Sequence, residues 1–164
     1  MKKLLMVFGF LVFGTTQAQF VLDDLDDDQF LQENGRTLFA ASLKHPMEHV
    51  RIKHCQAEHT RYARPSEGPE AFRKELFRTM QAYIDKETYA LNGTFSFIFR
   101  ISTQGRITDV RLHPKVANSE LLERDLKLMI RRLKSSWIPA SCKGVPLESE
   151  VRLKVNFQTE FFDS

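Results

Sequence analysis

The sequence predicts an α+β domain in which two helices pack on a small three-stranded antiparallel sheet, in the order helix–strand–strand–helix–strand. Three observations lead to this prediction. Residues 70–83 and 120–133 repeat apolar side chains at helical spacing. Residues 94–101, 107–112 and 151–157 alternate apolar and polar side chains, as half-buried strands do. Turn-forming residues separate these segments, and a chain of 164 residues favours one folded domain.

The first helix is expected to begin at Ser66–Glu70, where a polar residue precedes a proline and an acid lies near the positive end of the helix dipole. Its apolar residues recur at spacings of 4, 4 and 3 and form one stripe: Phe72, Leu76, Met80 and Tyr83. The stripe predicts that one face of this helix packs on the core.

A strand and a hairpin are expected to follow Asn92 and Gly93. One face of the first strand is fully apolar and consists of Phe95, Phe97, Phe99 and Ile101. A turn at residues 103–106 contains Gly105, which supplies the positive φ that tight hairpins favour. The second strand then returns over residues 107–112.

The second helix is expected after Asn118, and Pro139 comes after its end. Its buried stripe consists of Leu122, Leu126, Met129, Ile130 and Leu133, and several Lys and Arg side chains lie near its C-terminus, where they complement the dipole. The last strand alternates most clearly: one face has Val151, Leu153, Val155 and Phe157, and the other has Arg152, Lys154 and Asn156.

Three segments are predicted along the chain. Residues 1–18 form a signal peptide, because Lys2 and Lys3 precede 11 apolar residues and small residues lead to Ala18. Residues 19–65 form an N-terminal extension, partly disordered, with an amphipathic helix suggested by the apolar pairs at 30–31 and 38–39. Residues 66–160 form the domain. No apolar run reaches the roughly 18 residues that a membrane-spanning helix needs.

The extension opens with an acidic run: Asp23, Asp24, Asp26, Asp27 and Asp28. We interpret this run as a solvated tail, with shielding of the basic domain or binding to a basic partner as the alternative. The net charge of +3 does not predict a nucleic-acid partner, because such proteins cluster cations on one face.

Cys55 and Cys142 are candidates for a disulfide in an exported protein, with two unpaired buried thiols as the alternative. Four His side chains lie near Cys55, at positions 45, 49, 54 and 59, but their spacing matches no strong metal motif. No nucleophile elbow or phosphate-binding loop is present. We therefore expect no catalytic residue, no metal, no cofactor and no small-molecule substrate.

Residues 67–160 resemble the TonB C-terminal domain, including its stand-alone copies exported by Gram-negative bacteria. The matching stretches, in order, are Gly93–Thr94 with Phe99 near the end of the strand, Gly105–Val110, Trp137–Pro139, Gly144–Pro146 and Val151–Phe157. The sequence predicts neither a membrane anchor nor a Pro-rich spacer, so we expect a stand-alone member that does not transduce energy by itself.

The resemblance implies a non-enzymatic periplasmic module that binds an extended segment of an outer-membrane transporter, or of another envelope protein, by strand addition. A second copy of the chain is the other partner that it implies. Carried over to this sequence, the binding edge is the last strand: Val151, Arg152, Leu153, Lys154, Val155, Asn156 and Phe157. The alternative is a structural or stress-related envelope protein whose residues 19–65 carry the interaction.

Overall fold

The computed structural model describes residues 29–33, 37–84, 91–117 and 119–161, so the predicted signal peptide lies outside the described residues. These ranges contain two α-helices, α1 (Pro69–Tyr83) and α2 (Ser119–Ile130), together with a short 3-10 helix (Ala57–His59). The strands are β1 (Gln29–Glu33), β2 (Thr37–Ser42), β3 (Glu48–His49), β4 (Thr60–Arg61), β5 (Arg64–Pro65), β6 (Gly93–Ile101), β7 (Ile107–His113), β8 (Trp137–Ile138), β9 (Ala140–Cys142), β10 (Val145–Leu147) and β11 (Ser149–Phe161).

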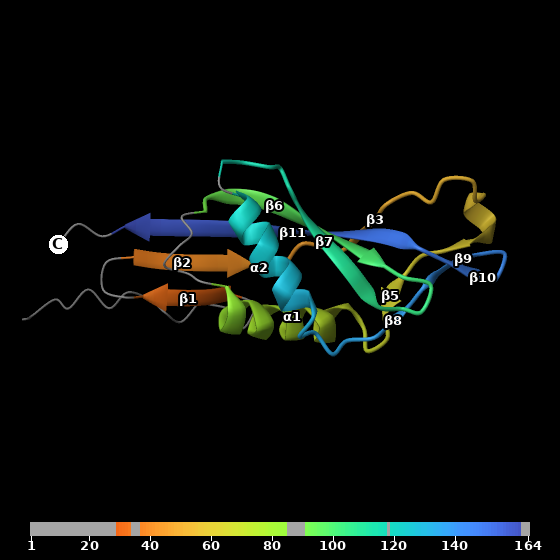
Figure 1. Cartoon of the computed structure of the whole chain (residues 1–164), viewed down its shortest axis with the longest axis horizontal. Helices are drawn as coiled ribbons and strands as arrows, with labels where there is room; N and C mark the ends of the chain where they lie inside the picture. Colours follow the sequence, from red (N-terminus) through yellow and green to blue (C-terminus); the bar gives the residue numbers. More distant parts are fainter. Residues whose placement is uncertain (1–28, 34–36, 85–90, 118, 162–164) are drawn as a thin grey trace, which may run out of the picture.

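The predicted α+β class with antiparallel sheets is confirmed, but the main sheet is larger than expected. It has six strands rather than three, in the order β1-β2-β11-β6-β7, with β3 also paired to β11 (Figure 1). Every pairing in it is antiparallel. The five predicted elements correspond to α1, β6, β7, α2 and β11, and the strands β8 to β10 separate α2 from β11 along the chain.

One face of the sheet carries the core. The alternating apolar side chains of β6 and β11 are at most 5% exposed, and they lie opposite each other in the ladder that pairs Phe97 with Leu153. The helices cover this face with most of the stripes expected from the sequence, led by Leu76 and Leu126, which are fully buried. Two expected members differ: Tyr83, at the last residue of α1, is 49% exposed, and Leu133 lies beyond the end of α2 and is only partly buried. The Phe72 ring makes edge contacts with Phe99 and Trp137, at centroid distances of 5.6 and 5.0 Å.

Residues 37–65 are part of the folded unit, so the expected boundary between extension and domain at residues 65 and 66 is not a structural one. The helix expected from the apolar pairs at 30–31 and 38–39 is wrong, because the first pair lies in β1 and the second in β2. The physical reason is the partner strand: β2 pairs with β11 over six residues, and Ala41 and Leu43 are only 1% exposed.

A smaller lobe projects from one end of the main sheet (Figure 1). It contains the three-stranded sheet β10-β9-β4, while β5 and β8 form a separate pair. The Cys55–Cys142 disulfide, predicted as one of two alternatives, is present and joins β9 to the segment before the 3-10 helix, with the two Cα atoms 5.9 Å apart. The lobe is therefore tied together by β pairing and by a covalent bond.

Candidate partner-binding edge of the sheet

The predicted binding edge, Val151–Phe157, is an interior part of the sheet. The strand β11 has β6 on one side, and on the other side β3 pairs with residues 151–152 and β2 with residues 156–161. The Glu150 carbonyl on β11 accepts a hydrogen bond from Val50 N at 3.0 Å, so the backbone groups of Glu150 point to the side of β2 and β3. Because these groups alternate along a strand, those of the other even-numbered residues of β11 point to the same side. This corrects the prediction of a free edge, because the chain's own β3 and β2 pair with the two ends of this stretch.

The charged side chains of β11 are also engaged within the chain. Lys154 Nζ lies 2.6 Å from Glu48 Oε1 on β3, and Arg152 lies 3.9 Å from the same carboxylate. The hydrogen bond from Lys154 is the largest cause that lowers the pKa of Glu48. Of the polar side chains predicted to touch a partner, Asn156 is exposed and lies 3.4 Å from the Thr94 hydroxyl.

An open edge lies instead at β7. This strand is at the end of the main sheet, and among the described residues β6 is its only strand neighbour. The Leu112 amide points away from β6, because it donates to Glu123 Oε2 on α2 at 3.4 Å. Since backbone groups alternate along a strand, the Val110 amide and carbonyl point to the same outer side. A segment added there would find main-chain donors and acceptors that have no strand partner among the described residues.

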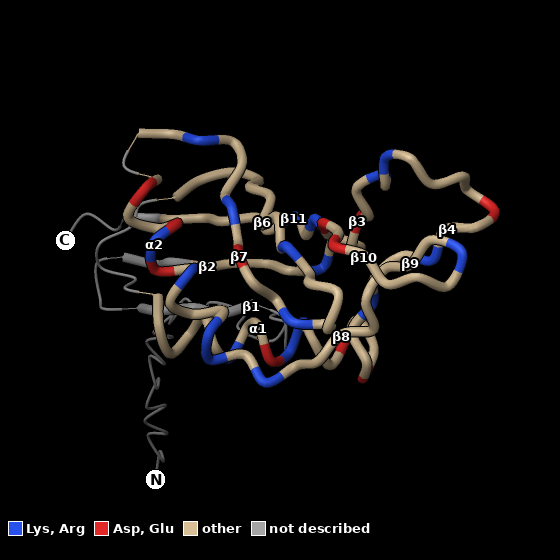
Figure 2. Tube along the Cα trace, turned by 45° about the vertical axis from the view of Figure 1, so that its right-hand side comes forward, with Lys and Arg blue, Asp and Glu red and all other residues tan. Residues whose placement is uncertain are grey.

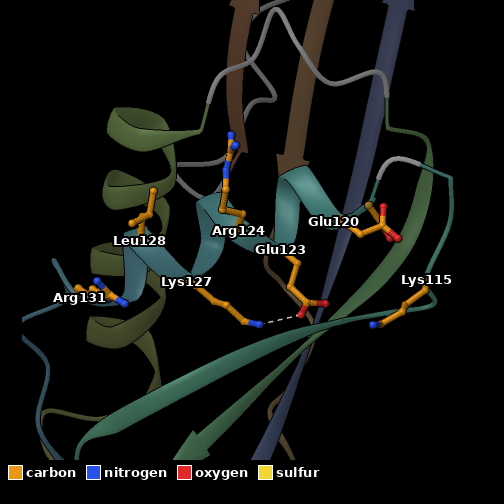
Figure 3. A pocket seen from close by; sticks show the side chains of 8 residues that line it. Lys115, Glu120, Glu123, Arg124, Lys127, Leu128 and Arg131 are labelled. Carbon is orange, nitrogen blue, oxygen red and sulfur yellow. Dashed lines mark hydrogen bonds and ion pairs between the residues drawn. The ribbon is translucent and has the colours of Figure 1, made fainter.

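The helix α2 runs beside this edge in the opposite direction to β7. Its buried stripe fixes the rotation of the helix, so that Glu123 and Lys127, one turn apart, face β7 (Figure 3). Lys127 Nζ lies 3.0 Å from Glu123 Oε1 and 3.9 Å from Asp109 Oδ1. The strand and the helix thus form the two sides of one groove.

A hollow of about 460 Å³ lies along the length of α2, and its lining comes from the helix and from the connection that precedes it. Lys115, from the connection that leads to α2, approaches the same space as Glu123 and Lys127, while Arg124 points away from β7 (Figure 3). Burial raises the pKa of Glu123, but the Lys127 hydrogen bond and the Leu112 amide outweigh it, so the net pKa is lowered. The Glu123 bond raises the pKa of Lys127. Both groups are therefore charged at neutral pH.

A second hollow, of about 370 Å³, continues the groove past Arg131 toward the C-terminus of α2. It lies between the β6–β7 turn and the segment after the helix, and Figure 2 shows Lys and Arg positions along this part of the molecule. Its charged lining consists of Arg106, Arg131 and Lys134, and its apolar lining of Ile107, Ile130 and Leu133. No carboxylate lines this hollow.

The His-rich segment near Cys55 does not converge on a site in the described part of the chain. Cys55 is used by the disulfide, and the His49 ring stacks on Tyr62 at a centroid distance of 4.9 Å, where burial lowers its pKa. Within the described ranges, no group of three or more His, Cys, Asp or Glu side chains is placed to hold a metal ion. Nor does any described helix have the length and apolarity to cross a membrane.

No protein-family model, no curated protein and no solved structure matches this chain. The resemblance to the TonB C-terminal domain therefore stays a prediction made from the residues. The groove between β7 and α2 was missed at the sequence level. Its signal was the charged positions of the second helix, which were interpreted only as a solvated, dipole-matched face.

Proposed function

We propose that the protein is a non-enzymatic binding module of the cell envelope that engages an extended segment of an outer-membrane transporter or another envelope protein by strand addition. The receiving edge is β7, and α2 lies beside it, linked by the Leu112–Glu123 hydrogen bond and the Lys127–Asp109 contact. The observation that supports this most directly is the Leu112 amide, which faces the groove and is held there by a side chain rather than by a strand.

Two further features support the proposal. Main-chain pairing gives affinity in strand addition, and the groove offers side-chain contacts that could give selectivity. The chain also builds its sheet in this way, since β2 joins β11 from a distant part of the sequence. The disulfide fits an oxidising compartment such as the periplasm, which is the location that the predicted signal peptide requires.

A proline substitution tests the edge. Val110→Pro removes an amide that points outward and leaves the hydrogen bonds to β6 in place. A photo-crosslinking residue at Thr108 on β7, in intact cells, is expected to capture an envelope protein, and Val110→Pro should abolish that crosslink. The matched control, Val110→Ala, loses the same buried side chain but keeps the amide, so its crosslink should remain. Persistence of the crosslink in a folded Val110→Pro protein would contradict strand addition at β7.

A second candidate is an envelope protein whose N-terminal segment carries the interaction. One observation favours it: the opposite outer strand of the main sheet is β1, which belongs to this segment. A crosslinking residue at Gln32 on β1 separates the two candidates. Crosslinks that form from Gln32 and are insensitive to Val110→Pro would select the second candidate.

A further inference from the structure

We infer that the groove selects acidic segments, and that the hollow at the C-terminal end of α2 binds the carboxylates of the added strand. This inference rests on the proposed function, because it names the chemistry of the segment that β7 receives. The hollow lies where an added strand would run on past Ile107, at the first residue of β7. Side chains of that strand would therefore reach it without a change of direction.

Charge is the first argument. Arg106, Arg131 and Lys134 come from two different parts of the chain and are all exposed. Within the described residues, none of the three forms an ion pair, and no carboxylate lines the hollow itself. The nearby Glu75 carboxylate is held by the amides of Lys134 and Ser135 and forms no ion pair with the three cations. Three unneutralised cations around one space favour an anionic ligand, and their repulsion is relieved when it binds.

The neighbouring cations behave differently. Lys127 and Arg124, also on α2, have the partners Glu123 and Asp125 at 3.0 and 3.2 Å. Complementing the helix dipole would explain cations near the end of α2, but it does not explain Arg106, which lies on the β6–β7 turn. The convergence of this turn with the helix end is what distinguishes a binding site from a solvated helix face.

The shape of the hollow indicates an extended peptide rather than a free ion. Ile107, Ile130 and Leu133 line its apolar part and are partly or fully buried. Alternate side chains of an added strand point to opposite faces, so one set can contact this apolar surface while neighbouring carboxylates reach the cations. An occupant with alternating apolar and acidic residues therefore fits better than a polyanion.

The test measures binding of two fluorescein-labelled ten-residue peptides to the chain from residue 19 onward, by anisotropy at low salt. One peptide alternates Val and Glu, and the other alternates Val and Gln. We expect the Val–Glu peptide to bind about 10-fold more tightly and to lose this advantage as salt screens the charges. Arg106→Gln, Arg131→Gln and Lys134→Gln should each weaken Val–Glu binding about 3-fold, and the triple variant about 30-fold. Arg51→Gln, the same charge change on the segment after β3, should have no effect.

The outcomes separate the selectivity from the strand addition. Equal binding of the two peptides, or a triple variant that binds Val–Glu like the wild type, would overturn the acidic selectivity, while strand addition stands if Val110→Pro still abolishes binding. Val–Glu binding that survives Val110→Pro but not the triple variant would support the carboxylate site and overturn strand addition. Binding of neither peptide would overturn both.

The chain's own acidic residues 23–28 are the competing occupant. Replacing all five Asp of that run by Asn tests this competitor directly. Unchanged affinity for the Val–Glu peptide would support a partner segment as the ligand. Tighter binding in the Asn variant would show that the chain's own run fills the hollow, and would overturn the assignment to a partner.

Discussion

Gly105 is the position where one added methyl group should damage the fold most. It has a φ of +71°, and a Cβ built there would lie 1.8 Å from the Trp137 carbonyl oxygen and 2.9 Å from its carbon. Both of these atoms belong to the backbone, so no side-chain rotation relieves the contact. The β6–β7 turn packs this closely on β8 because the Trp137 amide donates to the Gly105 carbonyl at 2.9 Å.

The cost of Gly105→Ala can be estimated from these contacts. An L-residue in the left-handed region costs about 1–2 kcal/mol. Moving β8 away to an ordinary contact breaks the hydrogen bond between the two residues, which leaves buried groups unpaired at about 1–3 kcal/mol. It also loosens Trp137, which is 3% exposed and packs on Phe72. We therefore expect a loss of about 3–5 kcal/mol in the free energy of unfolding.

Gly144→Ala is the matched control. Gly144 also has a positive φ, of +83°, but nothing lies within 4 Å of its added Cβ. This variant should lose only the conformational term of about 1–2 kcal/mol. Urea unfolding with the disulfide intact measures both variants, from the midpoint at an unchanged denaturant slope. A Gly105→Ala protein that is no less stable than Gly144→Ala would refute the close packing of the turn on β8.

Three other predictions concern stability. Leu43→Ala should lower the free energy of unfolding, measured in urea, by about 2–5 kcal/mol, because this side chain is 1% exposed. The control Val145→Ala, at a side chain that is 67% exposed, should change it by no more than about 0.5 kcal/mol. Equal effects would place residues 37–49 outside the folded unit. The pKa of Glu123 is lowered, so its carboxylate stabilises the fold above pH 4.5, and this contribution is lost as the pH falls through the folded-state pKa. In Glu123→Gln, the urea midpoint should therefore decline less between about pH 5 and pH 3 than in the wild type. An unchanged decline would contradict the pairing. The double variant Cys55→Ser and Cys142→Ser should lose about 4 kcal/mol for a sequence separation of 87, and unchanged thermal unfolding would show that the disulfide adds no stability.

The elements whose pattern is local were predictable from the sequence. The alternation in β6 and β11 and the stripes of α1 and α2 each predict a buried face, and the structure buries those faces except at Tyr83, where α1 ends. Gly105 was recognised as a turn residue, and its positive φ agrees. What the local pattern does not contain is the contact of this turn with Trp137, which comes from a different part of the chain.

The edge of the sheet could not be predicted in the same way. A strand with apolar residues on one face and Lys or Arg on the other has the same sequence pattern at the edge of a sheet as in its interior. Arg152 and Lys154 could point into solvent at an edge, and in the structure they lie beside Glu48 of β3 instead. The segment that covers it was obscure because its apolar residues come in adjacent pairs rather than in alternation. Its strand conformation is decided by pairing with β11, which is far away in the sequence.

The central position of β11 has a consequence for how the chain reaches this structure. The strand pairs with β2, β3 and β6, yet it is the last strand of the sheet to be synthesised. Until residues 149–161 are present, only the pairs β1–β2 and β6–β7 can form locally, and neither has the strand that joins them into one sheet. Closing such long loops slows folding. A chain made from its N-terminus therefore exposes unpaired strand edges on β2 and β6 until its last residues are available.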